Sequence, residues 1–219
     1  MQPVRLLAAV VLIGFSALSG LSRAEAQDLP GAQEAGTPEI PGAADVARVS
    51  GGTYTVDPDH TQVIWTVDHM GFSPLTGMFG KMSGTLVLDP KAPEDAKLDI
   101  KIPLAGLVVS SEEFGKHLAS PDFFDTAKFA EASFKSTNVT AEGTEGAIEG
   151  ELTLHGITRP VTLETTFFGA GINPMTKAEN IGFVATTTIK RSEFGLGYAV
   201  PLVSDEVELD VVGVFAKGP

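Results

Sequence analysis

Apolar and polar residues alternate along the stretch from Gln62 to Asp68 and beyond. The polar positions Gln62, Thr66 and Asp68 share one face of an extended chain, with Ile64 and Met70 as apolar exceptions. The opposite face holds Val63, Trp65, Val67 and His69. A period of two is typical of a strand that is wet on one side only. The pattern therefore predicts a strand whose dry face carries one imidazole.

Seven later segments show a similar extended pattern, and together with the first they predict about eight strands. They cover 81–89, 98–102, 132–141, 147–156, 161–169, 181–191 and 206–217. The compact connection around His155 and Gly156 predicts a hairpin between two of them. Nothing in the spacing suggests βαβ units, so the strands are expected to be antiparallel and to form either a barrel or a sandwich.

One segment breaks the strand pattern and predicts a short helix near 111–119. Ser110 or Ser111 can cap its first turn, where glutamates follow. Two adjacent aromatic residues, Phe123 and Phe124, come after the helix. Exposing both would be costly, so at least one is expected to cover an apolar surface, most simply an open end of the strand structure.

The predicted inner faces mix large apolar residues with small ones. The small residues are Gly150, Ala185, Thr187 and Gly213. A barrel of about eight strands is either filled by its side chains or holds one small ligand. Small residues on the inner walls favour a cavity over a solid core, although tapered barrels also use them at narrow ends.

The N-terminus has the features of an exported protein. Arg5 precedes an apolar run at 6–18, and Ala24-Glu25-Ala26 is a small-x-small site. We expect a signal peptide at 1–26, a flexible spacer at 27–52 and one domain at 53–219, which implies a periplasmic location. The absence of cysteine means that the domain is stabilised by its core, without disulfides.

The chain is acidic, with a formal charge of −13. Removal of Arg5, Arg23 and Glu25 with the signal peptide leaves 13 basic and 27 acidic residues, a charge of about −14. Because phosphate contacts require a cationic face, nucleic acid is not expected as a partner.

Six segments in order resemble the YceI-like family of lipid-binding proteins. They are YTVDPDHTQVIWTVDHMGFSPLTGMFG, HLASPDFF, FKST, GELTLHGITRPVTL, GFVATTTIKRSEFGLG and DEVELDV, within 54–215. The resemblance implies a lipocalin-like antiparallel barrel with a tunnel for an isoprenoid lipid, such as an isoprenoid quinone or a prenyl diphosphate. The chain departs from the family pattern at 129–132 and 108–113, both near the expected mouth of the tunnel.

The pattern and the resemblance together select candidate lipid contacts. They are Val63, Trp65, Val67, His69, Phe79, Leu98, Ile100, His117, Phe123, Phe124, Phe134, Leu152, Leu163, Phe167, Phe183 and Ala185. His69 could hydrogen-bond a ligand oxygen inside the barrel, or be a satisfied core histidine. His117 could bind a head group at the rim, or be a surface residue of the helix. For the aromatic residues the alternative is an ordinary packed core.

The expected function is that of a non-catalytic carrier whose only ligand is an isoprenoid lipid, with no metal and no other cofactor. The sequence contains no HExxH, GxSxG or phosphate-cradling glycine motif, and no cysteine nucleophile. Two alternatives remain open. One is an interaction or stress-response protein that docks transiently on a membrane protein or forms a homodimer, and the other is an isoprenoid-modifying enzyme that uses His69.

Overall fold

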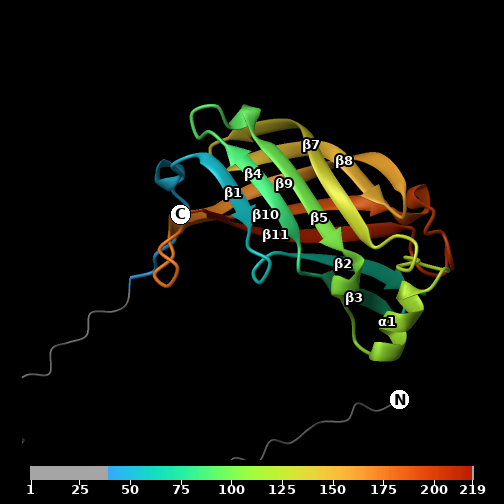
Figure 1. Ribbon diagram of the computed structural model, residues 1–219. Helices are drawn as coiled ribbons and strands as arrows, with labels where there is room; N and C mark the ends of the chain where they lie inside the picture. The colour runs from blue at the N-terminus through green and yellow to red at the C-terminus, as the bar shows by residue number, and fades with distance from the viewer. Residues whose placement is uncertain (1–38, 219) are drawn as a thin grey trace, which may run out of the picture. The chain divides into compact units, whose positions relative to one another are not determined.

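The computed structural model describes residues 39–218 (Figure 1). The expected signal peptide and the first part of the expected spacer lie outside these residues. The strands are β1 (Gly52–Val56), β2 (Gln62–His69), β3 (Ser73–Phe79), β4 (Ser83–Leu88), β5 (Lys97–Pro103), β6 (Leu107–Val108), β7 (Glu131–Glu142), β8 (Glu145–Leu154), β9 (Ile157–Ile172), β10 (Glu179–Lys190) and β11 (Glu206–Lys217). The helices are α1 (Glu112–Ala119) and the 3₁₀ turns η1 (Val46–Arg48), η2 (Pro93–Asp95), η3 (Leu104–Gly106) and η4 (Arg191–Phe194).

Eight of these strands close into an antiparallel barrel. Their order is β1-β4-β5-β7-β8-β9-β10-β11, and β11 pairs back with β1 through Tyr54↔Lys217 and Val56↔Phe215. Closure leaves no exposed sheet edge along most of the barrel. The predicted all-β barrel of about eight strands with one short helix is confirmed.

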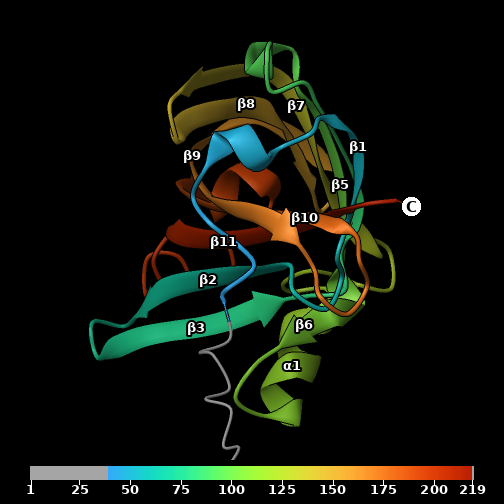
Figure 2. The same cartoon turned by 90° about the vertical axis from the view of Figure 1, so that its left-hand side faces the viewer.

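The first predicted strand is not a wall of the closed barrel. β11 pairs with β1 at its end but with β2 at its start, where Leu209 faces Trp65. From there β2, β3 and β6 continue the sheet beside the barrel, next to α1 (Figure 2). We call these three strands the side sheet.

The sequence pattern did not reveal β3, which contains a proline and a glycine. Pro74 lies opposite Asp68 at the β2–β3 end, and β6 covers only the other end of β3, so a missing N–H is tolerated there. Gly77 is required by packing, because a Cβ at this position would lie 2.2 Å from Cζ2 of Trp65. The indole therefore occupies the space that a side chain at 77 would need.

The local signals read from the sequence are found in the structure. His155 and Gly156 form the two-residue turn between β8 and β9, with φ of 52° and 74°, as a type I′ turn requires. Ser111 is the residue that caps α1, and its Oγ accepts a hydrogen bond from the N–H of Phe114 at 3.2 Å.

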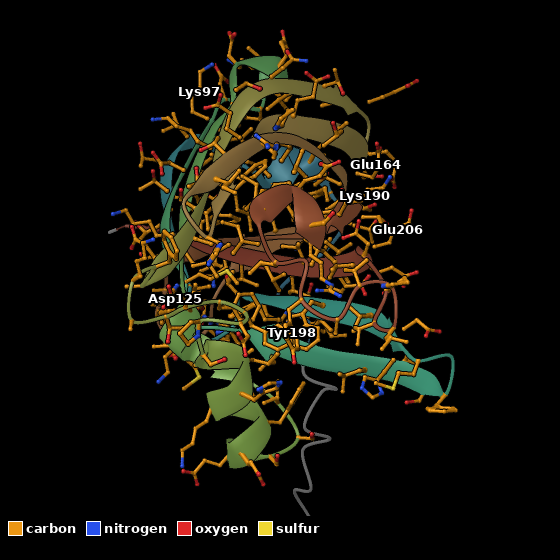
Figure 3. The ribbon with its side chains drawn as sticks, turned by 90° about the vertical axis from the view of Figure 1, so that its right-hand side faces the viewer. Lys97, Asp125, Glu164, Lys190, Tyr198 and Glu206 are labelled. Carbon is orange, nitrogen blue, oxygen red and sulfur yellow. The ribbon has the colours of Figure 1, made fainter. Side chains whose placement is uncertain are left out.

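One end of the barrel is filled by the η4 segment and the chain that follows it. Figure 3 looks onto this end, with Lys190 and Glu206 marking where β10 ends and β11 begins. Phe194 and Leu196 are almost fully buried here. The buried guanidinium of Arg191 donates hydrogen bonds to four backbone carbonyls that organise the segment, those of Ser204, Val203, Tyr198 and Leu196. This end is therefore closed by packed side chains.

Of the helices in residues 39–218, none has the length and apolar character needed to cross a bilayer.

Candidate functional site

The barrel encloses a cavity of about 440 Å³ that is lined mainly by apolar side chains. Because side chains alternate along each strand, every second residue of a barrel strand faces the interior, and some of these residues line the cavity. Phe183 contacts two other aromatic residues of the lining. The centroid of its ring lies 5.6 Å from that of Phe167 and 6.2 Å from that of Phe215. Cavities of roughly 300–1,000 Å³ with such linings are typical of sites for small ligands.

Three of the four small inner residues border this cavity, namely Ala185, Thr187 and Gly213. Gly150 does not, because the ring of Phe134 fills its place. A Cβ at Gly150 would lie 2.3 Å from Cζ of Phe134. The expectation that Gly150 leaves empty space is therefore wrong, since the missing side chain makes room for an aromatic ring.

The segment Glu39–Gly51 lies across the barrel end opposite η4, and we call it the N-terminal strap (Figure 2). Ala43 exchanges two backbone hydrogen bonds with Ala170 of β9, at 3.1 and 2.9 Å. Val46 and Val49 of the strap line the cavity, and Val49 is buried. The structure thus differs from the expected flexible spacer at 27–52, because part of that segment pairs with the barrel and covers its end.

A polar network fixes the end of the strap to the barrel. The hydroxyl of Tyr54 donates to Glu179 at 2.7 Å, and the N–H of Ser50 donates to the same carboxylate at 2.9 Å. Lys217 Nζ donates to Ser50 Oγ at 2.7 Å. Burial, followed by the contact with Glu179, raises the pKa of Tyr54 to about 12. Burial would raise the pKa of Glu179, but hydrogen bonds from Ser50 and Tyr54 outweigh it and the pKa is lowered.

The polar part of the cavity lining gathers at the turn between β7 and β8. Gly143, Thr144 and Glu145 of this turn region line the cavity. Glu145 is the one titratable side chain in the lining, among the residues that the structure describes, and it is exposed. The hydroxyl of Thr166 donates to its carboxylate at 2.7 Å.

A polar groove on the outside of the barrel continues from this turn. It shares Thr140, Ala141, Glu145, Gly146, Ala147 and Thr165 with the cavity lining. Glu142 and Glu164 add two further carboxylates to the groove, and Figure 3 labels Glu164 on the outer face. The cavity therefore opens toward a polar and acidic surface, and we call the shared residues the mouth.

The structure brings nine of the sixteen sequence-predicted site residues into the cavity lining. These are Val63, Leu98, Ile100, Phe134, Leu152, Leu163, Phe167, Phe183 and Ala185. The other seven lie outside the lining, and they are Trp65, Val67, His69, Phe79, His117, Phe123 and Phe124.

The four outlying residues on β2 and β3 follow the path of the side sheet. Trp65 is buried over Gly77, with no hydrogen-bond partner for its Nε1. His69 forms a backbone bridge with Val203 at the η4 end, away from the mouth. The alternation along β2 is that of a real strand, and its first apolar residue, Val63, borders the cavity. Trp65, Val67 and His69, on the same face, lie farther along β2 and pack in the side sheet.

The three remaining outlying residues belong to α1 and the loop after it. The His117 ring lies edge-on to Phe123 at 4.9 Å, and Phe123 contacts Tyr198 at 5.2 Å. Phe124 lies edge-on to Phe79 at 5.4 Å. These aromatics cover the side sheet and the η4 segment, so the expectation that they cover an apolar surface agrees with the structure, while His117 does not border the cavity.

Sequence reasoning missed the polar mouth and the strap. Val46 and Val49 carried no strand or helix period that could have revealed their role. Glu145 and Thr144 could have been noticed, because any long hairpin in a barrel places its turn at a barrel end. A single exposed carboxylate beside an apolar chamber provides no base, nucleophile and orienting group together, so this geometry is suited to binding.

Comparison with protein families gives one match that spans most of the chain. The model of the YceI-like domain matches residues 54–215. A UPF0312 protein of Pseudomonas fluorescens is 38% identical over 167 residues, which cover 75% of this chain and 86% of that protein. A UPF0312 protein of Vibrio parahaemolyticus is 36% identical over 165 residues, which cover 74% and 86%.

Solved structures share the barrel. BcnA of Burkholderia cenocepacia superposes with a TM-score of 0.65 at 26% identity, covering 73% of this chain and 98% of that one. The YceI protein of Campylobacter jejuni gives 0.61 at 25% identity, covering 69% and 90%. A polyisoprenoid-binding domain from Saccharophagus degradans gives 0.53 at 14% identity, covering 75% and 98%, a likeness of fold alone.

Proposed function

The chain belongs to the YceI-like family, and from this premise we propose that it binds and carries a long isoprenoid lipid in the barrel cavity, without catalysis. The observation that carries the proposal is the apolar cavity of about 440 Å³ inside a closed barrel. The Saccharophagus degradans neighbour is described as a polyisoprenoid-binding domain, which supports the same class of ligand. An isoprenoid quinone and a prenyl phosphate are both ligands of this class. We place the protein in the periplasm, to which the predicted signal peptide would export it.

The energetics of such binding come from the tail. Each buried CH₂ contributes about 0.8 kcal/mol, so one five-carbon isoprene unit contributes roughly 4 kcal/mol. Association costs about 4–15 kcal/mol in lost freedom before any affinity appears. Roughly three or four buried units are therefore needed for tight binding, and this favours a long tail over a single prenyl group.

A second candidate function is docking on a protein partner, and an exposed apolar surface favours it. Phe72, in the loop between β2 and β3, is 84% exposed, and Leu202, in the loop between η4 and β11, is 63% exposed. The N–H of Met70 donates to the carbonyl of Leu202 at 2.9 Å, so the two loops lie together. A membrane protein that exchanges lipid, or a second copy of the chain, would cover this surface.

Native mass spectrometry of protein purified without detergent tests the proposal. We expect a stoichiometric adduct that lipid extraction identifies as an isoprenoid. The Ala185→Trp variant, which places an indole in the cavity, serves as the matched control and should lose the adduct. An apo mass that persists after incubation with quinones and prenyl phosphates would overturn the lipid-carrier proposal and leave the docking function as the better candidate.

A further inference from the structure

The polar atoms of the cavity lining show where the head group of a bound lipid would lie. Thr140, Thr144, Glu145 and Thr165 all belong to the turn region between β7 and β8 and the facing part of β9. Two further threonines of the lining, Thr61 and Thr187, lie elsewhere. The hydroxyl of Thr61 is engaged with the backbone of Val214, both as donor and as acceptor, at 3.0 Å. The mouth is therefore where most of the polar lining is concentrated.

The charges at the mouth are negative. Glu145 belongs to both the cavity and the outer groove, and Glu142 and Glu164 line the groove. No Lys, Arg or His occurs in the lining of either, within the part of the chain that the structure describes. A phosphate bound here would meet carboxylates and threonine hydroxyls, without a cation to pair with.

Two cations at the strap, Arg48 of the strap itself and Lys217 of β11, are engaged elsewhere. Arg48 pairs with Asp45 at 3.9 Å and donates to the carbonyl of Pro41 at 3.1 Å. Lys217 donates to Ser50 Oγ and to the carbonyl of Gly51. The contacts of Arg48 are thus within the strap, and those of Lys217 hold the strap on β11.

Further cations at this end include Lys91, in the loop before η2, and Lys177, in the loop between β9 and β10, and neither lines the cavity. Lys91 lies between the lining residues Pro90 and Pro93, but it is not itself part of the lining. Three carboxylates, those of Asp89, Glu94 and Asp95, share this short loop with it. The rim on this side is thus also acidic in balance.

We infer that the carboxylates at the mouth make the cavity selective for isoprenoids whose head group carries no negative charge, and that Glu145 is the specificity-determining residue. This inference rests on the proposed lipid-binding function and narrows it. A quinone carbonyl or an alcohol can accept a hydrogen bond from the hydroxyl of Thr140 or Thr144, whereas the hydroxyl of Thr165 donates to the carbonyl of Leu163 at 3.2 Å. A phosphate or diphosphate is repelled by Glu145, with Glu142 and Glu164 behind it.

Two probes with the same tail isolate the effect of the head group, namely geranylgeraniol and geranylgeranyl diphosphate. We expect equilibrium dialysis at low salt to show the alcohol binding at least about tenfold tighter, because the charge repulsion at this exposed site is little screened there. In ~1 M salt, where the screening length is about 3 Å, the difference should shrink. Glu145→Gln keeps the shape and the acceptor for Thr166, and it should reduce the discrimination by about threefold or more.

The control variant is Glu208→Gln. Glu208 is an exposed residue on β11 toward the η4 end, so this variant should leave the ratio of the affinities for the two probes unchanged. Equal affinity for both probes, a ratio that Glu145→Gln does not move, or diphosphate binding that Lys91→Gln abolishes, would overturn the inference while the lipid-carrier function stands. Failure of both probes to bind would overturn the carrier function itself, and the inference with it.

Discussion

Ala185 offers the sharpest test of whether the space inside the barrel is a ligand cavity. It lies on β10, opposite Thr165 of β9 and Val211 of β11, and all three residues line the cavity. Replacing it with tryptophan would place an indole in that space. Because the indole fills an existing cavity, we expect the free energy of unfolding to change by less than about 1 kcal/mol.

The effect on ligand binding should be much larger than the effect on stability. If the indole displaces one isoprene unit, the lipid loses about 4 kcal/mol of binding energy, nearly a thousandfold in Kd. Equilibrium dialysis with geranylgeraniol measures this loss directly. Guanidinium denaturation followed by circular dichroism measures stability without depending on the added tryptophan's fluorescence.

Ala132 provides the matched control, because it is also a buried alanine of a barrel strand but does not line the cavity. Ala132→Trp overpacks a filled region and should lower the free energy of unfolding by about 1–3 kcal/mol. Equal destabilisation by Ala185→Trp and Ala132→Trp would refute the reasoning that only one of them borders empty space. A folded Ala185→Trp variant with unchanged affinity would refute the cavity as the binding site.

Three further predictions concern the strap, the closed end and the helix. Hydrogen bonds from Ser50 lower the pKa of Glu179 despite its burial. The stability that Glu179 contributes is therefore present above its unfolded pKa, about 4.3, and is lost as pH falls through the lower folded pKa. Glu179→Gln should make the denaturation midpoint fall less steeply in that pH range. Arg191→Met leaves buried carbonyls unpaired and should lower the free energy of unfolding by about 3 kcal/mol in urea titrations. The lipid affinity of the folded variant should be unchanged. A change in affinity alone would contradict the conclusion that packed side chains close this end of the barrel. Ser111→Ala should cost about 1 kcal/mol of stability through the lost cap, whereas the neighbouring Ser110→Ala should cost little; equal effects would argue against the cap.

Much of the fold was predictable because its signals are local. Alternation along β5, β8 and β11 indicates strands with one apolar face, and the compact His155-Gly156 connection between two alternating segments indicates the turn. The serine and glutamates at the start of α1 mark the helix. Such signals depend on residues a few positions apart, so a single sequence contains them.

Apart from Val63 of β2, the correctly predicted lining residues lie on strands of the closed barrel. Phe134, Phe167 and Phe183 line the cavity because β7, β9 and β10 are barrel walls. Trp65 and His69 show the same alternation, but pairing changes partner along β11 and places them in the side sheet. An alternating pattern shows that one face of a strand is apolar, but it does not show whether a ligand cavity or other side chains cover that face.

The sequence by itself determined an acidic, cysteine-free, antiparallel β domain of about eight strands with one short capped helix. Only the tertiary structure decided which dry faces surround the cavity, that the strap covers one end of the barrel, and that Glu145 lies at the mouth. The physical reason is that these features depend on strand pairing between residues far apart in the chain, as Ala43 with Ala170 and Trp65 with Leu209. Local patterns restrict such pairings, but closure of the barrel selects among them.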